Sequence, residues 1–133
     1  MIMQGGEQLD KVIYKELSYE IIRILFDVYN NFGYGYQEKY YQKALEVEFQ
    51  KMGMKYKSQC PYRIRYKGKI LGRCFIDFII DDKIVLEIKR GNHFCKRDFD
   101  QVIGYLKASG LKLGILAIFS PTGLRFKRVL NIK

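Results

Sequence analysis

The chain has 133 residues, 48% of them hydrophobic, which is enough for one core and predicts a single domain over residues 1–133. Lys and Arg outnumber Asp and Glu by 24 to 14, and the formal charge of +10 favours nucleic acid over a membrane as partner, because no basic amphipathic helix stands out. No segment is apolar enough for a signal peptide or a membrane span, so we expect a cytoplasmic protein.

The N-terminal part predicts two helices. We expect residues 1–6 to be frayed, and Ser18 to cap a helix that ends at Gly33 and Gly35. The apolar face of this helix comprises Ile21, Ile22, Leu25, Val28, Tyr29 and Phe32. A second helix is expected from Tyr36 or Gln37 to Met52, before Gly53. One side of it carries Tyr41, Leu45, Glu48, Phe49 and Met52.

From Met54 onward, an alternating pattern replaces helical spacing and predicts strands. In the first strand, Tyr62, Ile64 and Tyr66 alternate with Arg63, Arg65 and Lys67. Lys67-Gly68 is the expected turn into a second strand, which ends at Ile80. A third strand carries Glu87 and Lys89 and leads into a polar loop over residues 91–96.

The C-terminal part predicts a helix and two more strands. The helix runs from near Arg97 to Ser109 and is capped by Gly110. A central strand over 113–119, a turn over 121–123 and an edge strand over 124–129 complete the chain. The order α-α-β-β-β-α-β-β predicts an α/β fold with a mixed central sheet flanked by helices. The crossover helix implies one parallel pair.

Three cysteines constrain the chemistry. Cys60, Cys74 and Cys95 are odd in number and lack paired metal-ligand spacing, which argues against a disulfide framework and a zinc site. We expect reduced, mostly buried thiols.

Charged residues interrupt two very apolar strands. Asp77 lies within residues 75–80, and Glu87 and Lys89 lie within residues 83–89. A carboxylate in such a strand must shift its pKa, pair with an opposite charge or hold a metal. These residues therefore predict a functional site. The alternative is an internal ion pair between Lys89 and one acid.

The loop between these strands decides whether the charges meet. A two-residue loop at Asp81-Asp82 would place Asp77 and Glu87 on opposite faces. A three-residue loop over 81–83 pairs Ile80 with Ile84 and brings the two carboxylates to one face, as would a bulge of equal effect. We predict the three-residue loop, with Lys89 on the same face as Glu87.

Polar residues on the helices are further candidates. Glu38 lies in the first turn of the second helix, where the positive helix end favours an acid, and Tyr41 shares its face. On the third helix Gln101 and Tyr105 share a face; taken alone, they would be a surface amide and a packing tyrosine. His93, the only histidine, is expected to be an exposed loop residue.

In this order the motifs resemble the GxxExxY protein family of the PD-(D/E)XK nuclease superfamily, over about Leu17 to Asn131. The name-giving motif matches Gly35, Glu38 and Tyr41. The superfamily core matches Asp77 and the segment Glu87-Ile88-Lys89, and the Gln-x-x-x-Tyr element of RecB-type nucleases matches Gln101 and Tyr105. Relatives often carry His at the position of Asp98 and Arg at the position of Phe75. Neither difference removes a metal ligand.

The resemblance implies a restriction-endonuclease-like fold and Mg²⁺- or Mn²⁺-dependent hydrolysis of phosphodiester bonds, expected in DNA. Asp77 and Glu87 are suitable ligands for a hard cation. The main-chain carbonyl of Ile88 is an implied further ligand, and Glu38 would bind directly or through water. Lys89 would orient the attacking water or stabilise the developing anion, while Gln101 and Tyr105 would hold Lys89 or the phosphate.

Nucleic-acid contacts are expected outside this site. The candidates are Tyr41, Arg63, Arg65, Lys67, Lys69 and Arg73, with Tyr62 and Tyr66 available to stack on bases. Their alternation also suits an ordinary solvated strand. Two alternatives to the enzyme remain open: a noncatalytic nucleic-acid-binding module, and an interaction subunit whose apolar helix faces form oligomers. A homodimer is one way in which a small nuclease would cut both strands.

Overall fold

The computed structural model describes residues 13–132, so the prediction for residues 1–6 lies outside the described part. Two helices, α2 (Lys15–Phe32) and α3 (Glu38–Lys51), come first, and α4 (Lys96–Ser109) follows the third strand. The strands are β1 (Tyr56–Tyr66), β2 (Lys69–Ile80), β3 (Ile84–Arg90), β4 (Leu113–Ser120) and β5 (Gly123–Leu130). The predicted order of elements is confirmed.

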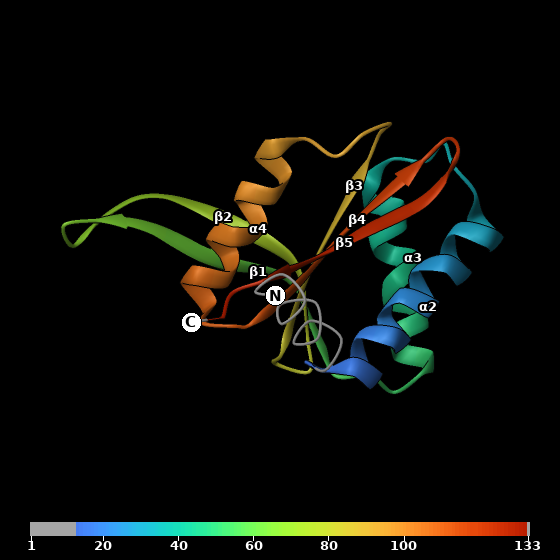
Figure 1. Ribbon diagram of the computed structural model, residues 1–133, viewed down its shortest axis with the longest axis horizontal. Helices are drawn as coiled ribbons and strands as arrows, with labels where there is room; N and C mark the ends of the chain where they lie inside the picture. Colours follow the sequence, from blue (N-terminus) through green and yellow to red (C-terminus); the bar gives the residue numbers. More distant parts are fainter. Residues whose placement is uncertain (1–12, 133) are drawn as a thin grey trace, which may run out of the picture.

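The five strands form one mixed sheet in the order β1-β2-β3-β4-β5. Only β3 and β4 are parallel, and α4 is the crossover between them. Every residue of β4 is buried, as expected for a central strand that helices cover on both faces. Helices α2 and α3 pack on one face of the sheet and α4 on the other (Figure 1).

Tyr41 anchors α3 to the sheet. Its ring is fully buried and stacks on Phe119 of β4 at a centroid distance of 4.2 Å. Its hydroxyl donates a hydrogen bond of 2.7 Å to the Gly33 carbonyl, at the residue that ends α2. One side chain therefore joins α2, α3 and the sheet. The expectation that Tyr41 contacts nucleic acid is wrong, because no part of the ring reaches the surface.

Two further predictions need correction. Ser18 does not cap α2, which begins at Lys15; Ser18 is buried within the helix and its hydroxyl donates to the Lys15 carbonyl. The helix starts earlier because Tyr14 and Leu17 pack against the core and extend its apolar face. The cysteines are also less buried than expected. Cys60 and Cys74 are half-buried, and Cys95 is exposed at the start of α4.

Two different helices cover the β1–β2 hairpin: α3 covers the part near the core, and α4 covers a part farther out. Near the core, Tyr56 and Phe78 pack on Phe49 of α3, whereas farther out Tyr62 packs on Tyr105 of α4. Because alternate residues of a regular strand share one face, the strands must rotate between these contacts. The rotation coincides with Gln59, whose backbone is left-handed at a φ of 49°, and the β1–β2 ladder lacks a pair there. Beyond α4 the hairpin projects from the body of the molecule (Figure 1).

Among the described residues, no helix combines the length and apolar character needed to cross a membrane.

Candidate active site

The site lies where β2 and β3 separate. Their pairing runs from Ile80 opposite Ile84 to Phe78 opposite Leu86, which confirms the three-residue loop. The Lys83 N–H closes the loop by donating a hydrogen bond of 2.9 Å to the Ile80 carbonyl. The main-chain ladder stops before the next pair, which would be Asp77 and Glu87.

At that point the carboxylates replace main-chain acceptors. The Asp77 N–H donates to Glu87 Oε1 at 2.7 Å, and the Ile88 N–H donates to Asp77 Oδ2 at 2.9 Å. Each acid therefore holds the opposite strand through a charge-assisted hydrogen bond. The two carboxylates are fixed next to each other at a point where they replace the main-chain hydrogen bonds between β2 and β3.

Two glutamines support Asp77, and neither was recognised from the sequence. Gln59 Nε2 donates to Asp77 Oδ1 and Gln42 Nε2 donates to the Asp77 carbonyl, both at 3.3 Å. Gln42 directly follows Tyr41 of the helix motif, which was the only sequence signal pointing to it. The position of Gln59 depends on its left-handed backbone, a conformation that glycine, asparagine and aspartate adopt more readily than glutamine.

Burial makes the site electrostatically unfavourable for two negative charges. Glu87 is only 2% exposed, and its pKa is raised to about 8, first by burial and then by the charge of Asp77. Burial also raises the pKa of Asp77. The pKa of Glu38 is raised chiefly by partial burial, although its side chain still reaches solvent. The charge of Lys89 lowers the pKa of all three acids without cancelling these effects.

The ammonium group of Lys89 is not in an ion pair with the acids of the site. In the part of the chain covering residues 13–132, no carboxylate lies within ion-pair distance of its ammonium. Lys89 follows Glu87 by two residues on β3, so the two side chains lie on the same face of the strand. Its charge lowers the pKa of Asp77, Glu87 and Glu38. The alternative in which Lys89 serves only to neutralise a buried acid loses its structural basis.

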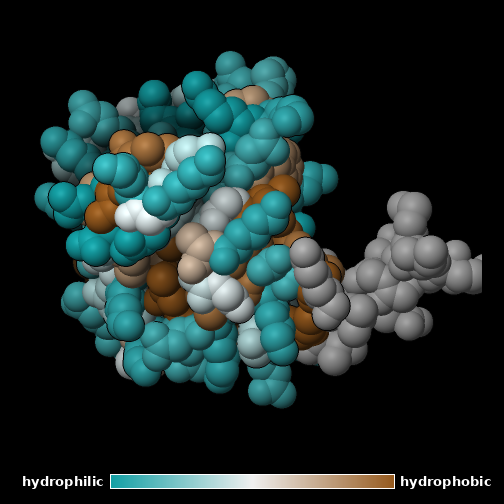
Figure 2. Space-filling view, turned by 90° about the vertical axis from the view of Figure 1, so that its left-hand side faces the viewer, coloured by the Kyte–Doolittle hydropathy of each residue, from teal (hydrophilic) through white to brown (hydrophobic). Residues whose placement is uncertain are grey.

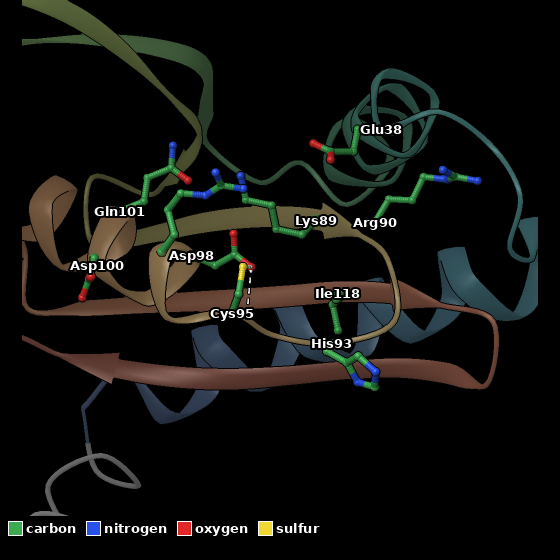
Figure 3. A pocket seen from close by; sticks show the side chains of 10 residues that line it. Glu38, Lys89, Arg90, His93, Cys95, Asp98, Asp100, Gln101 and Ile118 are labelled. Atoms are coloured by element: carbon green, nitrogen blue, oxygen red, sulfur yellow. Dashed lines mark hydrogen bonds between the residues drawn. The ribbon is translucent and has the colours of Figure 1, made fainter.

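Lys89 faces a cavity of about 680 Å³ (Figure 3). Glu38 points into this cavity from α3, Lys89 reaches in from β3 and Gln101 from α4, whereas Arg90 and His93 turn away (Figure 3). His93 is exposed in its loop, as predicted. A second cavity of about 460 Å³ is lined by Asp77, Ile88, Gln59 and again Glu38. Glu38 therefore lines both the cavity that Lys89 faces and the cavity that Asp77 lines.

Tyr105 is close to the site but has a different role from the one expected. It is buried, and its hydroxyl donates to the Phe75 carbonyl at 3.2 Å, two residues before Asp77. Burial and the charge of Glu87 raise the pKa of its phenol, which keeps the hydroxyl protonated as a donor. Tyr105 therefore braces β2 instead of holding Lys89 or a phosphate. Gln101 remains able to do so, since it lines the cavity with Lys89.

The donor set suits a hard divalent cation. Two carboxylates, a neighbouring main-chain carbonyl and a third acid at the rim are oxygen donors of the type that Mg²⁺ and Mn²⁺ prefer. In the conformation of residues 13–132, no three Asp, Glu, His or Cys side chains are already arranged as a metal cage. A carboxylate accepts about four hydrogen bonds, so Asp77 and Glu87 keep acceptor capacity beyond those they use. The chemistry of the residues therefore fits a cation, although the full shell is not preformed.

Comparisons with known proteins agree with this geometry. The family model for the PD-(D/E)XK nuclease superfamily matches residues 15–129. A solved structure, described as the crystal structure of SSO0001, is similar with a TM-score of 0.57 at 19% identity. The likeness covers 72% of this chain and 50% of that one, so this chain spans about half the length of that protein. At this identity the likeness shows a shared fold. A search of the curated proteins finds no match.

Proposed function

This chain belongs to the PD-(D/E)XK nuclease superfamily, and on that basis we propose that it is a Mg²⁺- or Mn²⁺-dependent nuclease that hydrolyses phosphodiester bonds in DNA. The observation that carries the proposal is the pair Asp77 and Glu87, locked together where β2 and β3 separate, with Lys89 beside them. We also propose membership of the GxxExxY group, a cytoplasmic location and a homodimer for cutting both strands.

Each residue has a defined task in this mechanism. Asp77, Glu87 and the Ile88 carbonyl would hold the cation, with Glu38 completing the shell directly or through water. The cation would supply a water of lowered pKa and positive charge against the phosphate. Lys89 would orient the attacking water, or its ammonium would donate to a phosphate oxygen as negative charge develops there. Gln101, from the opposite wall of the same cavity, would orient Lys89 or the phosphate.

Mn²⁺ titration calorimetry and cleavage of labelled DNA, applied to three variants, test the proposal. Asp77→Asn and Glu87→Gln should lose both metal binding and cleavage. Lys89→Met should still bind Mn²⁺ but cleave at least about a hundredfold more slowly, because it removes the group that orients the water or stabilises the developing anion and leaves the ligands intact. The matched control is Lys83→Met, which changes an exposed lysine in the loop directly before β3 and should cleave normally. Full cleavage by any of the three site variants would contradict the assignment.

A nucleic-acid-binding module that does not cut is the second candidate. It is favoured by the absence, among residues 13–132, of a preformed three-residue metal cage. Such a module should bind DNA equally well in Mn²⁺ and in chelator and should produce no fragments. Metal-dependent fragments from the wild type, lost in Asp77→Asn, would exclude it.

A further inference from the structure

The far half of the β1–β2 hairpin, residues 61–75, forms an arm that no other element covers at its tip. It turns at Lys67 and Gly68, both with positive φ, and projects beyond α4 (Figure 1). Several large apolar side chains are exposed along it: Ile64, Tyr66, Ile70, Leu71 and Phe75. Leu71 is 67% exposed, which is unusual for a leucine in a strand of a folded domain. These exposed apolar side chains are not needed for the core of the protein, so we look for a partner that covers them.

The charge of the arm has one sign. Residues 61–75 contain five cations and no Asp or Glu; the cations are Arg63, Arg65, Lys67, Lys69 and Arg73. Within the described residues, none of them is in an ion pair with a carboxylate. Arg63 and Arg73 lie directly opposite each other, although like charges at such positions destabilise a sheet. Together with Arg65 they line one hollow of about 390 Å³.

A bound polyanion would neutralise the repulsion between these cations, so the arm is suited to bind one. A second copy of the arm would bring five further cations against the first five, which like-charge repulsion opposes. A two-stranded ribbon fits the major groove of duplex DNA, where cations reach phosphates and apolar side chains meet base edges. Viewed from the arm's end of the molecule, hydrophobic residues are interspersed among hydrophilic ones (Figure 2). That mixture matches a groove better than an apolar protein partner.

The arm is a direct continuation of the active site. Arg73 and Asp77 are four residues apart on β2, or about 13 Å at the usual rise per residue. The tip at Gly68 is about 30 Å from Asp77 along the same strand. With about 3.4 Å per base pair, these lengths correspond to about four and about nine base pairs of duplex.

We propose that the arm binds duplex DNA on one side of the cleaved phosphate, with Arg63, Arg65 and Arg73 on the phosphate backbone and the tip in the groove. The inference rests on the proposed function for the position of the cleaved phosphate. It adds that the enzyme takes double-stranded DNA and needs about nine base pairs on one side for full affinity.

Fluorescence anisotropy in chelator tests binding without cleavage, with duplexes from about 8 to about 24 base pairs and a single-stranded control. The double variant Arg63→Gln/Arg73→Gln should weaken binding to long duplexes by on the order of tenfold or more in 0.1 M salt. The slope of log affinity against log salt should fall by about 2, and the shortest duplexes should bind almost equally. Lys112→Gln/Lys127→Gln, two exposed lysines outside the arm, carries the same charge change and should leave the slope nearly unchanged.

Three outcomes would overturn the inference. Wild-type affinity and slope in the arm variant would show that the arm does not touch DNA. Equal losses on single strands would show that the duplex is not the ligand. If Leu71→Ser turns a dimer into a monomer in sedimentation and leaves DNA binding unchanged, the arm is a subunit contact. Arm-dependent duplex binding in a protein that never cleaves would instead overturn the proposed function and leave this inference standing.

Discussion

At the scale of single residues, the main feature is a pair of acids that link β2 and β3 where the main-chain ladder between them ends. Asp77 and Glu87 each accept a main-chain N–H from the other strand, which fixes a buried and a half-buried carboxyl group next to each other. Burial first, and the charge of Asp77 second, raise the pKa of Glu87 to about 8. Such a pair costs folding stability, and conflicts of this kind concentrate at functional sites.

Replacing Glu87 by glutamine should therefore stabilise the protein in chelator. Because the folded state holds Glu87 protonated at pH 7 whereas the unfolded state is ionised, folding must take up a proton at a cost in free energy. Glutamine keeps an oxygen that can accept the Asp77 N–H and needs no such proton. We expect the free energy of unfolding at pH 7 to rise by about 1 to 3 kcal/mol, from the relation between pKa shift and free energy. Urea denaturation measures the change. Glu46→Gln, a half-buried acid on α3, is the control and should show no such gain. A clear loss of stability in Glu87→Gln would mean that the carboxylate is structural.

At the scale of elements, the position of α4 depends on one close approach to the sheet. A Cβ placed on Gly114 of β4 would lie 2.7 Å from Cγ1 of Val102 on α4. The same helix carries Gln101 into the cavity and Tyr105 onto β2. The small residue on β4 thus sets the distance of two site residues from the sheet.

Gly114→Ala should push α4 outward and destabilise the protein by about 1 to 3 kcal/mol, the usual cost of overpacking. Val102→Ala removes the methyl that the new Cβ meets. The double variant should therefore be more stable than the sum of the two single losses predicts, by about 0.5 to 3 kcal/mol. Thermal and urea unfolding measure the cycle. Strict additivity would show that the helix does not depend on this contact.

At the scale of the whole molecule, the site joins layers that are otherwise held by separate cores. Glu38 comes from α3 on one face, and Asp77 and Glu87 come from the sheet, where Glu87 acts electrostatically on Tyr105 of α4. The two hydrophobic clusters lie on opposite faces of the sheet. A ligand bound to these acids would therefore link both layers.

Metal binding should stabilise the folded chain as a whole. At a Mn²⁺ concentration of 100 times its Kd, the free energy of unfolding should rise by about 2.7 kcal/mol, and chelator should reverse the gain. Asp77→Asn should show no gain under the same conditions. Urea denaturation with and without Mn²⁺ measures both. An equal gain in Asp77→Asn would show that the ion binds elsewhere.

Much of this architecture was accessible from the sequence because local patterns specify it. Periodicity predicted the element order, and the three-residue loop over 81–83 is preferred to a two-residue loop because it brings Asp77 and Glu87 to one face; the structure has that register. Loop length sets register and alternation sets the face, so both follow from nearby residues. The sequence by itself thus determined the elements and the two registers between which the structure decided.

Only the tertiary structure decided how those acids are held and which neighbours serve them. Gln42 and Gln59 reach Asp77 across 35 and 18 positions of chain, and Tyr105 braces the Phe75 carbonyl across 30. Tyr41 became a buried anchor because α2, α3 and β4 meet around it, which no local spacing shows. Contacts between distant segments depend on how the layers pack, and that packing is a property of the whole chain.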